Sequence, residues 1–121
     1  MPVLCDWTQI VGDSSITVPV ANGGAEVPVP LDGSTFGTGG RVSTETALLI
    51  FSVKNMTGTA QVFINNHHVG DIGPTSGSLW STQLIAVSGT QINDGNNHLV
   101  MKNVTDAFNL KDLMCFFHQA A

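Results

Sequence analysis

Apolar and polar residues alternate along much of this chain, most clearly in its middle third. In the segment AQVFIN, the apolar side of the alternation consists of Ala60, Val62 and Ile64. A two-residue period that stops at Asn is typical of a β-strand ending in a tight turn. Because Asn tolerates the positive φ angles that a two-residue hairpin requires, the segment predicts a hairpin with Asn65 and Asn66 at its tip.

The same kind of pattern predicts further short strands and no long helix. The other candidate strands are residues 3–11, 47–54, 79–87, 98–104 and 113–118. Residues 47–54 are apolar on both faces for most of their length, which indicates a central strand covered on both sides. Residues 105–111 are compatible with one helical turn capped by Thr105 or Asp106. About eight short strands with regular turns predict a single all-β domain over residues 1–121, an antiparallel β-sandwich of two sheets.

Two glycine-containing segments interrupt the first half of the chain. Residues 16–30 are roughly symmetric around Asn22-Gly23-Gly24, which predicts a second hairpin, and their prolines place these strands at a sheet edge. Residues 31–44 form a long loop with four glycines, and loops of that length are often binding loops or mobile lids. The glycine spacing does not match a phosphate-binding loop, so nucleotide binding is not expected.

Composition narrows the classes of function. Hydrophobic residues make up 42% of the chain and charged residues 11%, with a net charge of −5. The average domain has about 25% charged residues, so this surface must consist largely of Ser, Thr, Asn, Gln and Gly. Such a surface suits a carbohydrate binder, or a subunit that hides much of its area in an assembly. The scarcity of Lys and Arg argues against binding to nucleic acid or to anionic membranes, and no apolar run is long enough to span a bilayer.

Neither localisation nor redox state follows from the sequence. The first residues, MPVLCDWTQ, lack the basic segment and apolar run of a signal peptide. A cytoplasmic protein, a removed signal and unconventional export all stay open, although the composition suits extracellular or cell-surface use. Cys5 and Cys115 lie near opposite ends of the chain, where a disulfide is compatible with a sandwich, but two buried reduced thiols are the favoured interpretation.

Residues 60–103 resemble a known family pattern. They contain AQVFINN-HHVG, then SLWSTQLIAV, then DGNNHLVMKN with Gly95 and Asn97. This order is similar to that of galactose-binding-like jelly rolls, as in the sugar-binding-type accessory domains of glycoside hydrolases, with Asn66 where Gly is usual. The resemblance implies a jelly-roll fold and carbohydrate binding, although many such domains are purely structural. It also implies a structural calcium ion, which galactose-binding-like folds often carry.

The candidate ligand-binding residues lie around turns. Trp80 follows a loop rich in Gly and Ser and precedes hydroxyl and amide side chains, an arrangement suited to stacking on a sugar ring; the alternative is a core Trp between the sheets. We expect side-chain hydrogen bonds to the sugar from Gln83, Asn65, His67 and Asp71. No Cys/His spacing matches a metal motif, and the aspartates lack the spacing of a calcium loop, so no metal ligands are predicted.

Catalysis has little support in the sequence. No Gly-x-Ser-x-Gly elbow occurs, and nothing places the only two glutamates, Glu26 and Glu45, together. We therefore predict no enzymatic activity and no cofactor.

Two hypotheses of different classes remain. The first is a lectin-like carbohydrate-binding module whose partner is a glycan. The second is a self-associating structural subunit without a small-molecule ligand, because residues 113–118 are apolar on both faces and must be central or covered by a partner. The two are compatible, since weak sugar sites gain avidity in a homo-oligomer.

Overall fold

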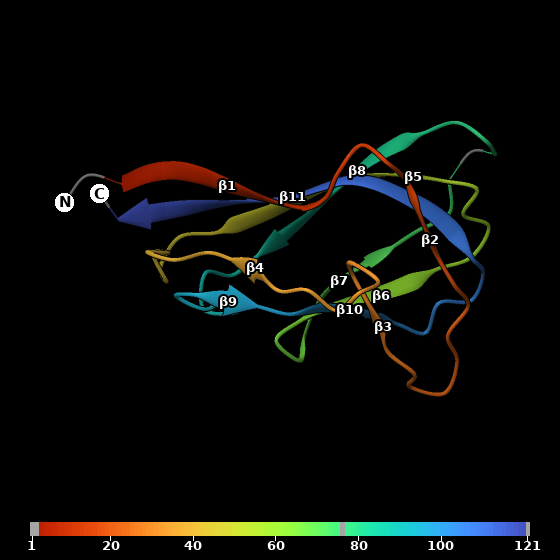
Figure 1. Cartoon of the computed structure of the whole chain (residues 1–121), viewed down its shortest axis with the longest axis horizontal. Coiled ribbons are helices and arrows are strands. Elements are labelled where there is room, and N and C mark those ends of the chain that lie inside the picture. The colour runs from red at the N-terminus through yellow and green to blue at the C-terminus, as the bar shows by residue number, and fades with distance from the viewer. Residues whose placement is uncertain (1–2, 76, 121) are drawn as a thin grey trace.

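Antiparallel strands stack in two layers in the computed structural model of this chain, which describes residues 3–75 and 77–120 (Figure 1). All eleven secondary-structure elements in those residues are strands. No helical segment long and apolar enough to cross a bilayer is present in them. The all-β sandwich that the alternation predicts is therefore confirmed, whereas the jelly-roll topology stays a prediction.

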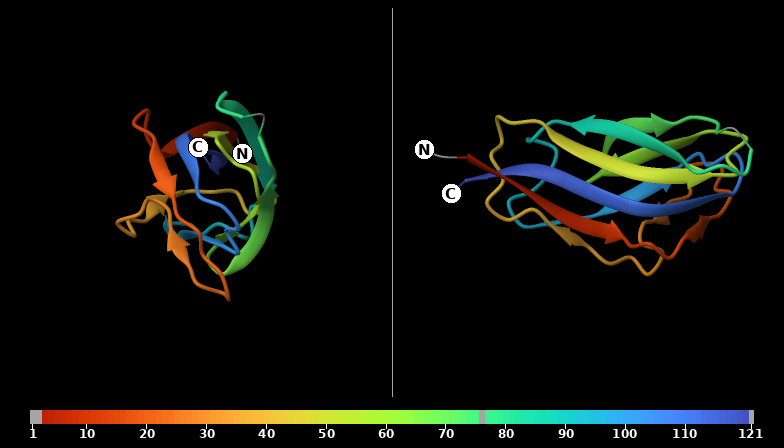
Figure 2. Two further views of the ribbon diagram at one scale, coloured as in Figure 1. Left: turned by 90° about the vertical axis from the view of Figure 1, so that its right-hand side faces the viewer. Right: turned by 90° about the horizontal axis from the view of Figure 1, so that it is seen from above.

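The first sheet contains the longest strands. Its order is β1 (Val3–Val11), β11 (Phe108–Ala120), β5 (Ala47–Lys54) and β8 (Ser81–Val87). The short strand β2 (Ile16–Val18) pairs with the first residues of β11, beyond the end of β1. With its thirteen residues, β11 is long enough to pair with β1 and β2 one after the other along the same edge, as the view from above shows (Figure 2).

The second sheet lies opposite the first, and a small ladder is found at one end of the sandwich (Figure 1). The order in the second sheet is β3 (Val27–Pro28), β10 (Leu99–Lys102), β6 (Ala60–Ile64) and β7 (His67–Ile72). The small ladder pairs β4 (Phe36–Gly37) with β9 (Asn96–Asn97). Part of the glycine-containing loop at residues 31–44 is thus a strand.

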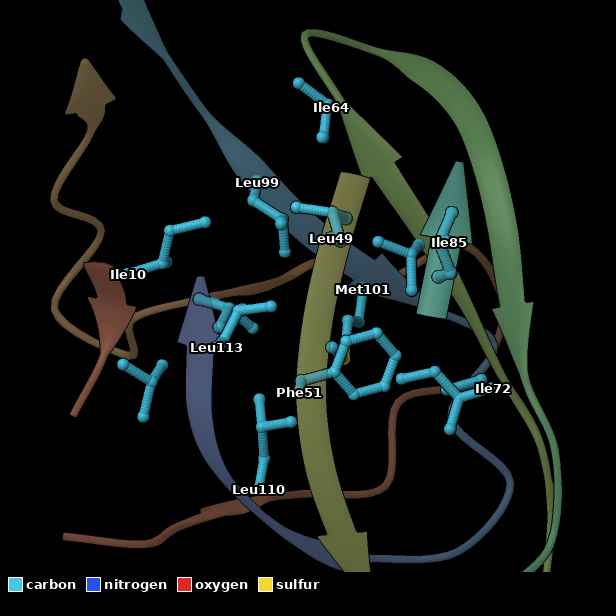
Figure 3. Packing of buried hydrophobic residues seen from close by; sticks show 14 of the residues in the cluster. Ile10, Leu49, Phe51, Ile64, Ile72, Ile85, Leu99, Met101, Leu110 and Leu113 are labelled. Atoms are coloured by element: carbon cyan, nitrogen blue, oxygen red, sulfur yellow. The ribbon is translucent and has the colours of Figure 1, made fainter. Parts of the chain in front are cut away.

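The alternation in the strands builds the core between the sheets. Figure 3 shows Leu49 and Phe51 of β5 in one cluster with Ile72 and Met101 of the second sheet. All four side chains are at most 2% exposed. Burying a side chain of this size contributes about 1.5–3 kcal/mol, so the inward positions hold the two sheets together.

The hairpin predicted at Asn65 and Asn66 is confirmed. These residues form the loop between β6 and β7, with φ angles of 50° and 69°. Positive φ at both positions gives a turn whose twist matches that of the paired strands. The side chain of Asn65 also fixes the tip against the chain near β9. Its Nδ2 donates to Oδ1 of Asn97 (2.9 Å), and its Oδ1 accepts from the backbone N–H of His98 (3.0 Å).

The second hairpin, predicted for residues 16–30, is wrong. The turn itself forms, with Gly23 and Gly24 at positive φ. However, β2 pairs with β11 in the first sheet, and β3 pairs with β10 in the second. The segment therefore crosses from one sheet to the other. Both strands lie at sheet edges, as their prolines predict.

The helical turn predicted at residues 105–111 is also wrong, because β11 already begins at Phe108. Phe108 and Leu110 are buried and the residues next to them are not, which is the period of a strand. Asp112, with a φ of 53°, lies at a register shift against β5. This bulge returns Leu113 to the inner face, so the strand continues with its apolar side toward the core.

The first sheet packs against the second through its inner face only. On β5, Leu49 and Phe51 are buried, whereas Leu48 and Ile50, which alternate with them, are partly exposed. Figure 2 shows no described segment of the chain layered over the outer side of this sheet. The expectation that residues 47–54 are covered on both sides is thus met on the inner face alone.

Candidate functional site

The five residues predicted to bind a ligand do not come together in one site. Trp80 precedes β8, next to two lysines of the first sheet, whereas Asp71 lies on β7 in the second sheet. Gln83 is on β8, and its Nε2 lies 3.4 Å from the backbone oxygen that it donates to in the loop after β7. His67 is exposed at the start of β7, and Asn65 holds the hairpin tip.

Trp80 is partly exposed and does not belong to the core cluster between the sheets. The Nζ atoms of Lys54 and Lys111 lie 4.7 Å and 4.4 Å from the centroid of its ring. Ammonium groups at such distances are attracted to the electron-rich face of an indole. The ring therefore has less free surface for stacking on a sugar than the sequence interpretation requires.

A depression of about 260 Å³, lined mostly by residues with polar side chains, lies where β6 and β7 pair in the second sheet. Its lining residues are Thr59, Ala60, Gln61, Asp71, Asn103 and Thr105. Strand register brings these residues together, because Gln61 pairs with Asp71 on one side and with Lys102 on the other. Asn103 follows directly, and its Nδ2 donates to Oε1 of Gln61 (2.6 Å). One carboxylate and two amides thus converge from three segments of the chain.

Two threonines complete the wall of the depression. The backbone N–H of Thr59 donates to Oγ1 of Thr105 (2.9 Å), and the backbone N–H of Thr105 donates to the carbonyl of Thr59 (3.0 Å). Gly58 permits this close approach, because a Cβ at that position would collide with the hydroxyl of Thr105. The loop before β6 and the loop after β10 are therefore held together beside the two amides.

A β-bulge places Asp71 next to His68. Residues three apart in a regular strand point to opposite faces. The β6–β7 ladder, however, shifts register between Val62 and Phe63, which brings both side chains to the same outer face. Nε2 of His68 lies 2.7 Å from Oδ1 of Asp71. Within the described residues, Oδ2 of Asp71 and Nε2 of Gln61 have no hydrogen-bond partner, so one acceptor and one donor remain open.

An aromatic pair lies beside Asp71, next to the residues that line the depression. The rings of Phe63 and His68 are stacked, with their centroids 5.1 Å apart and an interplanar angle of 27°. Nζ of Lys102 lies 4.5 Å from the centroid of Phe63 and 3.6 Å from the carboxylate of Glu26. Because the side chain of His68 is 43% exposed, the imidazole offers a flat surface to solvent beside Asp71.

The described residues contain no group of three His, Cys, Asp or Glu side chains that could hold a metal ion. The two cysteines are free thiols, with Cys5 exposed and Cys115 buried. They face opposite sides of the first sheet, since Cys5 pairs with His118 and Cys115 with Thr8. Burial raises the pKa of the Cys115 thiol to about 12, because the thiolate would lie in apolar surroundings.

The depression brings together groups that form hydrogen bonds. A single carboxylate lines the depression, whereas most glycoside hydrolases use a pair. The pair formed by His68 and Asp71 has no hydroxyl or thiol nucleophile hydrogen-bonded to it among the described side chains. The two groups without a hydrogen-bond partner among the described residues, Oδ2 of Asp71 and Nε2 of Gln61, can accept from and donate to a polar ligand.

Sequence reasoning identified Asp71 but missed Gln61, Asn103 and His68 as its neighbours. The available signal was the hairpin tip, from which the partner of each residue on β6 can be counted. That count fails at the bulge, so the composition of the depression required the structure. No protein-family model and no curated protein matches this chain, so the site is interpreted from its own geometry.

Proposed function

We propose that this protein is a non-catalytic carbohydrate-binding module and that the sugar binds in the depression beside Asp71. The observation that supports this most strongly is the convergence of an open carboxylate oxygen, two amides and two hydroxyls beside an exposed flat ring. Sugar hydroxyls donate to carboxylates and accept from amide N–H groups. Both kinds of partner are present here.

Each group has a distinct role in this proposal. Oδ2 of Asp71 accepts from a sugar hydroxyl, and Nε2 of Gln61 donates to a neighbouring one. Asn103 positions the Gln61 amide through their hydrogen bond. The exposed imidazole of His68 packs against the carbon-bound hydrogens of the sugar ring.

Size and charge narrow the ligand class. The depression, at about 260 Å³, is smaller than the pockets of drug-sized ligands, which span about 300–1,000 Å³. It therefore suits one sugar ring rather than an extended oligosaccharide. Asp71 and the net charge of −5 disfavour acidic sugars, so we expect neutral glycans.

The sequence supports the same function. Residues 60–103 resemble galactose-binding-like jelly rolls, and they supply Gln61, Asp71, His68 and Asn103. A jelly-roll topology and membership of that superfamily are part of the proposal. A shallow site with few open hydrogen-bonding groups gives weak affinity for a single sugar, which is usually compensated by multivalent display.

The test is an array of immobilised neutral and acidic glycans probed with protein at high density. We expect binding to neutral glycans, and we expect Asp71→Ala to weaken it about tenfold or more, because hydrogen bonds to charged groups contribute about 1.5–3 kcal/mol. Asp13→Ala is the matched control, since Asp13 is an exposed turn aspartate outside the depression. It should bind like the parent chain.

A further variant distinguishes between the two candidate locations of the sugar site, beside Asp71 and beside Trp80. Trp80→Ala should leave glycan binding unchanged if the sugar lies beside Asp71. Loss of binding in Trp80→Ala but not in Asp71→Ala would move the site to the first sheet. The absence of any bound glycan at high protein density would remove the proposed function.

A further inference from the structure

The outer face of the first sheet is apolar over two adjacent rows of side chains. In the first row Trp7, Phe116 and Leu48 are paired across β1, β11 and β5. In the second row Met114, Ile50 and Leu84 are paired across β11, β5 and β8. We call these six residues the outer apolar face. Trp7 and Leu84 are 54% and 60% exposed, and the other four are partly exposed.

The formally charged residues of this sheet lie outside the two rows. The registers place no Asp, Glu, Lys or Arg within the two rows. The nearest lysines on the same sheet, Lys54 and Lys111, gather around Trp80. Contiguous apolar surface of this kind, bordered by polar residues, marks interaction sites in soluble proteins.

The face also carries a projection and a hollow. A hollow of about 310 Å³ lies at the end of the first row, lined among others by Cys5, Leu48, Phe116 and His118. Trp7 stands beside it, with its ring centroid 6.5 Å from that of Phe116. A large side chain and a depression that could receive one are therefore present on the same side of the sheet.

We propose that the outer apolar face binds a second copy of this chain, in a dimer with two-fold symmetry. In a two-fold interface the same patch on both subunits meets itself. Because the two rows carry no formal charge, their contact brings no like charges together, although each chain carries a net charge of −5. Trp7 of each copy enters the hollow of the other, and the lysines beside Trp80 lie at the rim, where polar residues belong.

The size of the face is sufficient for a reversible dimer. Strands spaced about 4.8 Å apart, with a rise of about 3.3 Å per residue, give the four strands a flat area of about 400 Å² over the length of β8. Two copies that meet over this whole side of the sheet bury about 800 Å² in total, which is the size of a weak, transient interface. The dimer should therefore dissociate on dilution. Trp7 is its expected anchor, because Trp is enriched among the residues that dominate interface energies.

Sedimentation equilibrium from micromolar to millimolar concentration, without any sugar, tests this proposal. The parent chain should pass from monomer to dimer as its concentration rises. Trp7→Lys and Leu84→Lys should each raise the dimer dissociation constant about tenfold or more, because each places a charge within the apolar contact between the two copies. Leu31→Lys is the matched control, since Leu31 is also exposed but lies in the loop after β3, and it should dimerise like the parent chain. Circular dichroism establishes that all variants are folded.

Labelling of Cys5 with maleimide provides a second readout on the same samples. Cys5 is exposed and lines the hollow, whereas Cys115 is buried, so the labelling rate reports on Cys5 alone. The rate should fall as the concentration of the parent chain rises, and for Leu84→Lys the fall should begin only at about tenfold higher concentration or above.

Three results would overturn the proposal. The first is a parent chain that remains monomeric at millimolar concentration, including one whose hollow instead takes up the apolar dye 1-anilinonaphthalene-8-sulfonate. The second is a dimer that neither lysine variant weakens. The third is assembly that continues beyond the dimer. None of these bears on the sugar site, which lies on the other sheet.

Discussion

The two thiols of this protein differ because the first sheet places them on opposite faces. Cys115 is on the inner face of β11, where burial raises its pKa from 9.0 to about 12, and Cys5 is exposed. The thiolate is the reactive form of cysteine. Burial therefore protects Cys115 from modification and also links the folding free energy to pH at the alkaline end.

The sign of that linkage follows from the direction of the shift. A thiol whose pKa is higher in the folded protein releases its proton first in the unfolded chain, so its contribution is complete below pH 9 and falls between about pH 9 and 12. The slope is up to about 1.4 kcal/mol per pH unit. We expect the free energy of unfolding, measured with urea at pH 8 and pH 10.5, to fall less in Cys115→Ala than in the parent chain. An equal fall in both proteins would show that Cys115 does not carry this dependence.

Asp71 shows how one inserted residue decides the composition of a site. If the residues of β6 and β7 paired one to one outward from Asn65 and Asn66, as in a regular hairpin, Asp71 would lie opposite Ala60 and point toward the core. The bulge instead places it opposite Gln61, and Gly70 takes the inward position, where a Cβ would lie 2.8 Å from Ile85. The sequence HHVGDI has no regular alternation, so periodicity could suggest Asp71 as a polar residue near a turn but could not give its neighbours.

At the scale of the elements, local patterns predicted strands well and their pairing poorly. The bounds of β1 and β5 agree with the sequence. In β5, buried apolar positions alternate over all eight residues, which identifies a strand without reference to its partners. The segment at residues 16–30 encodes a turn, but β2 and β3 find partners more than seventy positions away in the chain. In β11, the bulge at Asp112 interrupts the alternation, which made the residues before it resemble a helical turn.

The β6–β7 hairpin gives a prediction at this scale. Asn66 has a φ of 69° and an exposed side chain, so its contribution comes mainly from the backbone. Left-handed geometry costs a residue with a Cβ roughly 1–2 kcal/mol, and Asn tolerates it better than Ala. Asn66→Ala should therefore lower the free energy of unfolding by about 1 kcal/mol, whereas Asn66→Gly should not lower it, as thermal or urea unfolding would measure.

The control for that comparison is Asn96→Ala. Asn96 is also exposed but does not have a positive φ. The change there should lie within about 0.5 kcal/mol, as for most surface substitutions. Equal losses at both positions would mean that the turn geometry is not what Asn66 contributes.

At the scale of the whole molecule, the two sheets share one hydrophobic cluster. It includes Leu49 and Leu113 from the first sheet and Ile64 and Leu99 from the second. Neither sheet can bury its inner face without the other, so we expect a single cooperative unfolding transition. Far-ultraviolet circular dichroism, which reports on all strands, should superimpose on tryptophan fluorescence in urea. Two separate transitions would contradict the single domain expected from the sequence.

The outer faces of the two sheets point in opposite directions. This orientation determines how a dimer would bind to cells or polymers. Two chains joined back to back through the first sheet would hold their Asp71 depressions at the far ends of a four-layered particle. That geometry does not favour gripping neighbouring sugars on one surface. It favours bridging, so the pair would agglutinate glycan-coated particles, and a chain carrying Leu84→Lys would coat the same particles without joining them.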